Sequence, residues 1–335
     1  MTEFNGAARS RLMQLWDMLD LITPMAIRVA GTLRVADHIQ EGRDSLPQLA
    51  AATGAHPDAL RRLLRYLVAR DVFTEPEPDR FGLTGLSELL TDGHPAASRG
   101  WMDLEGFGGR MDLAFFQLLE TVRTGAAAEG WRDHLRDEQV AASYDEIMEA
   151  QSRMQASAIA DAHEWPETGH IVDVGGGTGT LLVHLLHEYP RLRGTLLELP
   201  HAADRADAVI TEAGLTGRCD VLTGDLNDVQ IPAADVYLFK FVWHAFDDDG
   251  VVRALRRCTE AGSAGSRVVV IEHSAEPGDD RGGFTSMDLR MLVLGEGRER
   301  TVDEYAALGA HAGLELGAVT PTPDGLHIIE LRHGG

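Results

Sequence analysis

A glycine-rich stretch after a short apolar segment constrains the fold of this chain most. Residues 171–174 read IVDV, residues 175–179 read GGGTG, and a helical pattern rich in leucine follows. Glycine permits a sharp turn and a close approach of backbone N–H groups to a ligand, so such turns join a strand to a helix at cofactor sites. The next apolar run ends near Glu198, and a carboxylate at that strand tip suits a ribose diol. The order predicts a site for a nucleotide-type cofactor.

The spacing of the glycines distinguishes between cofactors. A dinucleotide fingerprint needs Gly175, Gly177 and a glycine or alanine at position 180, where this chain has Thr180. The Gly-Lys-Ser/Thr of a P-loop is absent as well. Asp173 stands just before the first glycine, where a phosphate binder would avoid a negative group. The pattern therefore favours a cationic ligand, and it leaves a nicotinamide-dependent oxidoreductase as a disfavoured alternative.

Apolar runs and helical patterns alternate from the glycine turn to the end of the chain. The predicted strands are 171–174, 195–199, 220–223, 236–239, 267–272, 314–320 and 326–332. Such alternation predicts a Rossmann-like α/β fold, with a mostly parallel seven-stranded sheet covered on both faces and an antiparallel strand at its end. Ligands bind at the carboxyl ends of the strands in sheets of this kind.

Polar side chains stand at or just after those strand ends. They are Asp173, Glu198, Asp225, Lys240, His244 and Glu272. Asp225 is a candidate acceptor for an adenine amino group with Leu226 against the ring face, although an aspartate there also fits a turn cap. Lys240 and His244 are four residues apart and would share a face if the segment were helical. A histidine at a strand exit is a candidate general base.

The N-terminal part predicts a separate helical domain. Residues 44–92 look like a winged helix-turn-helix, with a capped helix from Ser45, a turn at Gly54, a second helix from Pro57 and a short hairpin. Arginines on the second helix raise the alternative of a DNA-binding regulator. Acidic residues in the wing and a formal net charge of -23 disfavour it. We therefore interpret the module as structural and dimerising.

Two further features of the N-terminal part concern binding. Apolar positions between residues 9 and 39 recur at helical spacing and suit either a partner subunit or the chain's own core. Large side chains between residues 101 and 154, among them Trp101 and Phe107, predict a pocket for a flat apolar molecule. The domain boundary is predicted before the first cofactor strand, giving domains 1–163 and 164–335.

Composition limits the location and the partners. The chain has two cysteines, which is too few for a disulfide scaffold, and no uninterrupted apolar stretch of the roughly 20 residues that a membrane span needs. Its acidity works against phosphate backbones and anionic membrane surfaces. We expect a cytoplasmic protein that binds neither nucleic acid nor membrane.

Together these segments resemble the class I S-adenosylmethionine-dependent O-methyltransferases of small molecules, of the plant caffeate type and the bacterial polyketide-tailoring type. The resemblance rests on VDVGGGTG at 172–179, Glu198, residues 224–226 and residues 240–244, preceded by the winged-helix segment. It covers nearly the whole chain. The family's catalytic histidine begins a His-Asp-Trp motif, whereas this chain reads His244, Ala245 and Phe246.

The resemblance implies a set of roles and a homodimer formed through the N-terminal domain. His244 would be the general base, with Glu272 and Glu299 orienting its ring, and no metal would be needed. Met148 and Met291 match positions that contact the acceptor. The cofactor would be S-adenosylmethionine, with S-adenosylhomocysteine as its product, at a site formed by Asp173, Gly175, Gly177, Glu198, Asp225, Leu226 and Lys240.

The implied reaction is methylation of a hydroxyl on an aromatic or polycyclic molecule, in polyketide-type secondary metabolism. In-line attack on the methyl group depends mainly on positioning, and a positioned base adds a factor of about 10² to 10⁴. The main alternative is a relative on the same scaffold that binds the cofactor but catalyses hydroxylation or decarboxylation. The retained His244, Glu272 and Glu299 argue against it.

Overall fold

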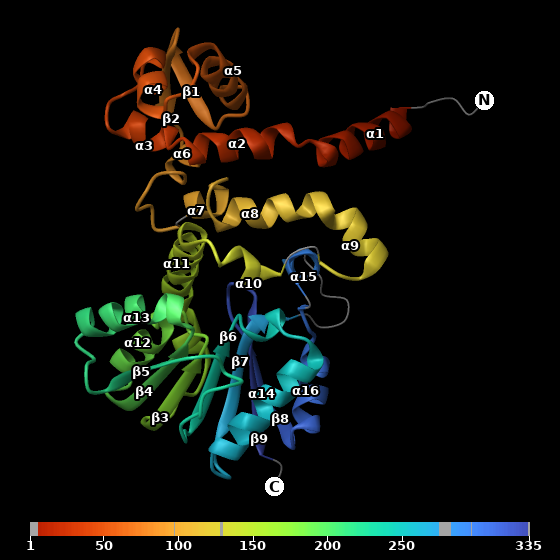
Figure 1. The fold of residues 1–335 in the computed structure, drawn as a ribbon. Coiled ribbons are helices and arrows are strands. Elements are labelled where there is room, and N and C mark those ends of the chain that lie inside the picture. The colour runs from red at the N-terminus through yellow and green to blue at the C-terminus, as the bar shows by residue number, and fades with distance from the viewer. Residues whose placement is uncertain (1–5, 97, 128–129, 275–282, 296, 334–335) are drawn as a thin grey trace. The chain divides into compact units, whose positions relative to one another are not determined.

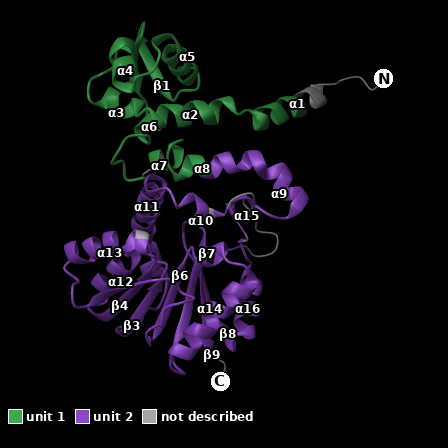
Figure 2. Ribbon diagram, in the orientation of Figure 1, with its two compact units in different colours: residues 1–110 green, residues 111–335 purple. Residues whose placement is uncertain are grey.

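The computed structural model describes residues 6–96, 98–127, 130–274, 283–295 and 297–333 of the chain. The chain divides into two compact units, Met1–Arg110 and Met111–Gly335 (Figure 2). Each unit has its own architecture. None of the described helices is both long and apolar enough to cross a membrane.

Unit 1 is mostly helical and contains the winged helix. Helices α4 and α5 form the helix-turn-helix, and the antiparallel strands β1 and β2 form the wing, which confirms the predicted module (Figure 1). The core of the unit includes Leu49, Leu64, Leu67 and Phe73, each 1% exposed or less. Its elements are α1 (Gly6–Leu19), α2 (Ile22–Thr32), α3 (Val35–Gln40), α4 (Leu46–Thr53), α5 (Pro57–Val68), β1 (Phe73–Glu77), β2 (Arg80–Leu83), α6 (Gly85–Glu88) and α7 (Ser98–Met102). Helix α8 (Phe107–Leu113) crosses the division.

The arginines of α5 are neutralised by acidic neighbours. Arg61 lies 2.8 Å from Asp79, and Arg65 lies 2.8 Å from Glu75, both of which belong to the wing segment. A helix that reads DNA would offer such cations to phosphates. These ion pairs agree with the structural interpretation of the module.

Unit 2 contains the sheet. The strand order is β5-β4-β3-β6-β7-β9-β8, parallel from β5 to β7, with β9 antiparallel to both neighbours. The predicted α/β fold with a seven-stranded sheet is thus confirmed (Figure 1). The strands are β3 (Thr168–Val174), β4 (Arg191–Glu198), β5 (Cys219–Thr223), β6 (Val236–Lys240), β7 (Arg267–His273), β8 (Leu314–Pro321) and β9 (Leu326–His333).

Helices cover both faces of this sheet with separate apolar clusters. Helices α14 and α16 pack on one face, and α11, α12 and α13 pack on the other.

The predicted domain boundary differs from the division into units. Residues 111–163 belong to the compact unit of the sheet, in which α11 packs against α12, so the boundary predicted at 163/164 lies inside that unit, just before β3. The helices are η1 (Ala114–Gln117), α9 (Leu118–Thr124), α10 (Trp131–His134), α11 (Glu138–Ala162), α12 (Thr180–Glu188), α13 (Pro200–Glu212), η2 (Trp243–Ala245), α14 (Asp248–Ala261), α15 (Gly283–Leu294) and α16 (Val302–His311).

Candidate active site

The glycine turn joins β3 to α12, as its sequence predicts. Gly175 and Gly177 have φ values of 70° and 61°, in the left-handed region that other residues rarely adopt. A Cβ atom at Gly175 would lie 2.8 Å from Val242 Cγ2, whereas one at Gly177 would meet nothing within 4 Å. The turn at Gly177 therefore presents its backbone to open space, as a cofactor-binding loop requires.

Glu198 is tied to this turn by backbone hydrogen bonds. Its Oε2 accepts from the N–H of Gly177 at 2.8 Å, and its Oε1 accepts from the N–H of Leu199 at 2.7 Å. Burial raises the pKa of Glu198 to about 7, although both N–H donors act in the opposite direction. Each oxygen keeps a lone pair for a further donor, such as a ribose hydroxyl.

Asp173 is a buried carboxylate of a different kind. It is 1% exposed, and among the described residues neither of its oxygens has a hydrogen-bond partner. Burial raises its pKa to about 7, helped by the charge of Glu198 and opposed by Lys240. A buried carboxylate without donors costs folding free energy, and a cationic or N–H-bearing ligand would remove that cost.

Lys240 ends β6 on the same side of the sheet as Asp173. Its Nζ lies 3.2 Å from Ser152 Oγ of α11, and burial lowers its pKa to about 8 against the opposing charges of Asp173 and Glu272. The condition for Lys240 and His244 to share a helical face is not met. Phe241 has a φ of 55°, and only Trp243–Ala245 form a short 3-10 turn.

Asp225 follows β5 and caps a turn, in agreement with the alternative considered for it. Its Oδ1 accepts from the backbone N–H and the side-chain amide of Asn227, both at 2.9 Å. Leu226 is 7% exposed and belongs to the apolar cluster on the α14 face. Contact of either residue with an adenine ring stays a prediction.

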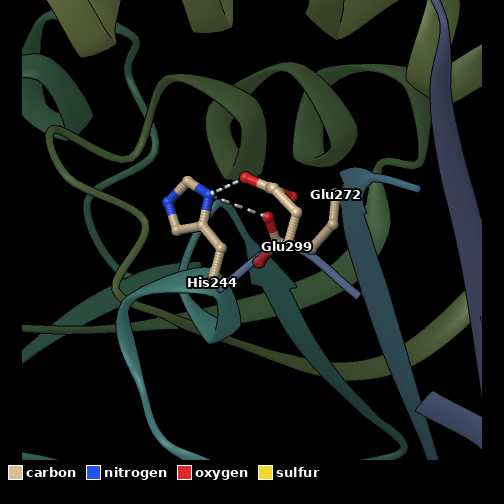
Figure 3. Close-up of side chains that lie close together, drawn as sticks. All are labelled: His244, Glu272 and Glu299. Carbon is tan, nitrogen blue, oxygen red and sulfur yellow. Dashed lines mark hydrogen bonds and ion pairs between the residues drawn. The ribbon is translucent and has the colours of Figure 1, made fainter. Parts of the chain in front are cut away.

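His244, Glu272 and Glu299 come together from three segments of the chain (Figure 3). Nδ1 of His244 donates to Glu299 Oε1 at 2.9 Å and lies 3.5 Å from Glu272 Oε2. Both carboxylate side chains are 0% exposed, whereas that of His244 is 14% exposed. With Nδ1 engaged, Nε2 is the nitrogen left to exchange a proton with a substrate.

Glu272 also shapes the loop that carries His244. Its Oε1 accepts from the N–H of Val242 at 2.9 Å and from the N–H of Trp243 at 2.8 Å. Burial raises the pKa of Glu272 to about 7, while His244 lowers it and Glu299 raises it further. One carboxylate thus orders the backbone beside His244 and places a negative charge next to its ring.

The two carboxylates also determine the basicity of His244. Burial alone would lower the pKa of the imidazole, but the charge of Glu272 and the hydrogen bond to Glu299 outweigh it, so the pKa is raised. This environment stabilises an imidazolium, which is what a general base becomes. The ligand atoms of the three side chains lie within 4.8 Å of one another, a grouping that a metal ion could also use.

Arg300 is a further residue of this site, and its sequence pattern does not reveal it. Its side chain is 1% exposed, and its guanidinium donates to the carbonyls of Trp243 at 2.9 Å and Phe246 at 2.8 Å. It also pairs with Asp248 at 2.7 Å. Arg300 therefore holds both ends of the turn that carries His244. Its only sequence signal is that it adjoins Glu299.

The four residues predicted for the acceptor pocket are divided between the two units. Met148 on α11 and Met291 on α15 belong to unit 2 and are half-buried. Trp101 on α7 is half-buried and Phe107 on α8 is buried, and both belong to unit 1. Their joint role as a pocket stays a prediction.

Comparison with known proteins finds relatives along nearly the whole chain. A family model described as an O-methyltransferase domain matches residues 118–315, and an O-methyltransferase dimerisation domain matches residues 16–93. The 2,7-dihydroxy-5-methyl-1-naphthoate 7-O-methyltransferase of Streptomyces carzinostaticus is 42% identical over 91% of this chain and 93% of its own. The aclacinomycin 10-hydroxylase RdmB of Streptomyces purpurascens is 42% identical over 89% of this chain and 82% of its own.

A similar solved structure is also that of an O-methyltransferase. The O-methyltransferase NcsB1 from neocarzinostatin biosynthesis, in complex with S-adenosylmethionine and 2-hydroxy-5-methyl naphthoic acid, is 41% identical with a TM-score of 0.86. The match covers 95% of this chain and 98% of that one.

Proposed function

This chain belongs to the O-methyltransferase family, and we propose that it transfers a methyl group from S-adenosylmethionine to a hydroxyl on a fused aromatic ring. Family membership confirms the resemblance inferred from the sequence. The fused-ring acceptor is proposed from the naphthoate named for one relative and the naphthoic acid bound in a solved one. An acceptor of that kind belongs to aromatic polyketide-type secondary metabolism.

The residues at the carboxyl ends of β3 and β4 fit the methyl donor. S-adenosylmethionine supplies an electrophilic methyl group on a sulfonium, and it also carries an ammonium and a ribose diol. Glu198, which accepts a hydrogen bond from the Gly177 N–H, keeps lone pairs that would accept from ribose hydroxyls. The oxygens of Asp173, which have no hydrogen-bond partner among the described residues, suit the positive groups. A dinucleotide would instead bring phosphates next to two buried carboxylates.

The observation that carries the proposal is the hydrogen bond from His244 Nδ1 to Glu299 at 2.9 Å, with Glu272 at 3.5 Å. The two carboxylates hold the ring so that Nε2 accepts the proton of the acceptor hydroxyl as the new C–O bond forms. They then stabilise the imidazolium by their charge. Because a phenol releases its proton only near pH 10, removing it at neutral pH requires such a base.

A hydroxylase on the same scaffold is the second candidate, because RdmB is as similar in sequence as the methyltransferase relative. Hydroxylation needs no base aimed at a substrate hydroxyl. The pairing of His244 with two buried carboxylates therefore favours methyl transfer.

The test is the fate of a labelled methyl group. Purified protein is incubated with a panel of hydroxynaphthoic acids and with S-adenosylmethionine whose methyl group is labelled with ¹³C. The masses of the products are then measured by mass spectrometry. We expect a labelled methyl on the acceptor, and about a 10² to 10⁴-fold lower rate for His244→Ala. Addition of oxygen without the label would establish the hydroxylase instead. Equal rates for both proteins would remove His244 as the base.

We also propose that the protein is a homodimer formed through unit 1. Helix α1 and the start of α2 expose large apolar side chains, including Trp16 at 60%, Met18 at 78% and Ile22 at 64%. This stretch overlaps the matched dimerisation domain, so a second copy of the chain is the partner it suits. Light scattering should give the mass of a dimer, and Trp16→Glu combined with Leu19→Glu should give a monomer. A wild-type monomer would contradict the proposal.

A further inference from the structure

Phe241 is an active-site residue for which the mechanism above has no role, and its backbone conformation is unusual. It follows β6 directly and has a φ of 55°, which a bulky side chain adopts only when the surroundings enforce it. Its N–H donates to the carbonyl of Ile271 in β7 at 3.1 Å, which fixes the turn against the neighbouring strand. Backbone strain kept in this way is often found at functional sites.

The strained turn places the Phe241 ring among three groups that can carry positive charge. The ring of His244 stacks on it, with centroids 5.8 Å apart and planes inclined by 19°. The ring of His273 lies 5.2 Å away at 32°, and Lys240 Nζ lies 4.4 Å from the ring centroid. Aromatic faces attract cations, and centroid distances of this size are those of interacting rings.

We propose that Phe241 is a positioning residue for the general base. Its ring supports the imidazole plane of His244 while Nδ1 points to Glu299, and it offers an aromatic face to the imidazolium formed during transfer. This inference rests on the proposed function, in which His244 accepts the proton. It adds that the residue after β6 must be aromatic.

The expected direction of the effect follows from the charges around His244. The groups that act on its charge are Glu272, Glu299 and Arg300. His273 and Lys240 lie against the Phe241 ring, and Tyr305 is affected by the same two carboxylates. The two carboxylates favour the imidazolium, whereas Arg300 disfavours it. Removing the Phe241 ring would remove its cation–π attraction for the imidazolium. This loss disfavours the imidazolium, so the pKa of His244 should fall.

Three substitutions of Phe241 separate the ring from the strained backbone. Phe241→Leu keeps a side chain at the left-handed position but removes the ring. Phe241→Gly removes the ring and relaxes the backbone. Phe241→Trp keeps an aromatic face. Phe239→Leu serves as the control, because this buried ring in β6 meets Trp243 edge-on at 4.7 Å and is not stacked on His244.

Two measurements are made on the full-length protein: the imidazole titration of His244 by NMR, and kcat and KM against pH with an acceptor identified from the hydroxynaphthoic acid panel. We expect Phe241→Leu and Phe241→Gly to lower the pKa of His244 by about half a unit to one unit and kcat about tenfold. The acid limb of the kcat profile should move to lower pH. KM for S-adenosylmethionine should change less than threefold. Phe241→Trp should keep wild-type values within about twofold, and Phe239→Leu should leave the His244 titration unchanged.

A wild-type His244 titration in Phe241→Leu would overturn the proposal, as would a Phe241→Trp variant as impaired as Phe241→Leu. If Phe241→Gly alone kept wild-type behaviour, the ring would have no role. The titration needs no acceptor. Failure of the proposed function, seen as no methyl transfer by the wild type, is therefore distinguishable from failure of this inference.

Discussion

Asp173 in β3 and Glu272 in β7 are both buried carboxylates near the carboxyl ends of their strands, but their surroundings differ. Asp173 in β3 is 1% exposed and Glu272 in β7 is 0% exposed, and burial raises the pKa of each to about 7. Glu272 accepts two backbone N–H groups and lies beside His244, whereas Asp173 has no hydrogen-bond partner among the described residues. Glu272 therefore organises the loop beside it, whereas the oxygens of Asp173 are the ones we propose for a ligand.

Strand order explains how the two carboxylates can differ. β6 lies between β3 and β7, so the two strands are two strand spacings apart, roughly 10 Å, and the register sets Asp173 level with Val269, three residues before Glu272. The charges of both carboxylates act to raise the pKa of Lys240 at the end of β6. The comparison therefore predicts separable effects, with Glu272 acting on kcat and Asp173 acting on cofactor affinity.

The largest effect is expected for Glu272→Gln. The amide oxygen can still accept from the loop N–H groups, but the negative charge next to His244 is lost. The pKa of His244 should fall, the acid limb of the kcat profile should move to lower pH, and kcat should fall about 10²-fold, within the range of a positioned base. Activity assays between pH 5 and pH 9 measure kcat and the position of its acid limb. The Kd for S-adenosylhomocysteine, measured by calorimetry, should stay within about threefold.

Glu330→Gln provides the matched control for that variant. Glu330 in β9 is equally buried, and it is paired with Arg267 at 2.9 Å. Its loss should lower the unfolding temperature but leave kcat unchanged. If Glu272→Gln instead weakened S-adenosylhomocysteine binding and preserved kcat, the proposed difference between the two carboxylates would be wrong.

The sheet and the carboxylates at its edge could be predicted because local sequence determines them. Alternating apolar runs give the strands, and the glycine turn gives the first crossover. β3 and β4 nevertheless begin earlier than expected, at Thr168 and Arg191, because polar residues at strand starts break the apolar pattern. The positions of Glu198, His244, Glu272 and Glu299 were inferred from strand ends and from the resemblance.

Residues whose role depends on tertiary packing were not predictable. Arg300 looks like a surface charge in sequence, and only the fold shows its guanidinium buried against the Trp243 carbonyl. Phe241 looks like part of a strand, and the sequence gives no sign that its φ is 55°. The same reversal of the backbone is why the shared helical face considered for Lys240 and His244 does not form.

Asp173→Asn should have a smaller effect, limited to the affinity for the cofactor. A hydrogen bond to a charged partner contributes about 1.5 to 3 kcal/mol, so the Kd for S-adenosylmethionine should rise roughly 10- to 100-fold. kcat at saturating donor should change little. In the wild type, affinity should also weaken as pH falls below about 7, because protonation of Asp173 removes the charge that the cationic donor needs. Calorimetry of both proteins at pH 6 and pH 8 measures this, and equal affinities would contradict the assignment.

The same substitution should stabilise the protein when no cofactor is bound. A carboxylate whose folded-state pKa is raised from 3.8 to about 7 stabilises the fold below pH 3.8, and this contribution is lost as pH rises to about 7. The amide that Asp173→Asn introduces cannot ionise, so at pH 8 the variant should gain up to about 4 kcal/mol, less the cost of burying that amide. Thermal unfolding at pH 8 should therefore rank Asp173→Asn above the wild type without ligand. Saturating S-adenosylhomocysteine should reduce or reverse that order, because the wild type binds more tightly. A variant less stable than the wild type in both conditions would mean that Asp173 stabilises the fold itself, as Glu272 stabilises its loop.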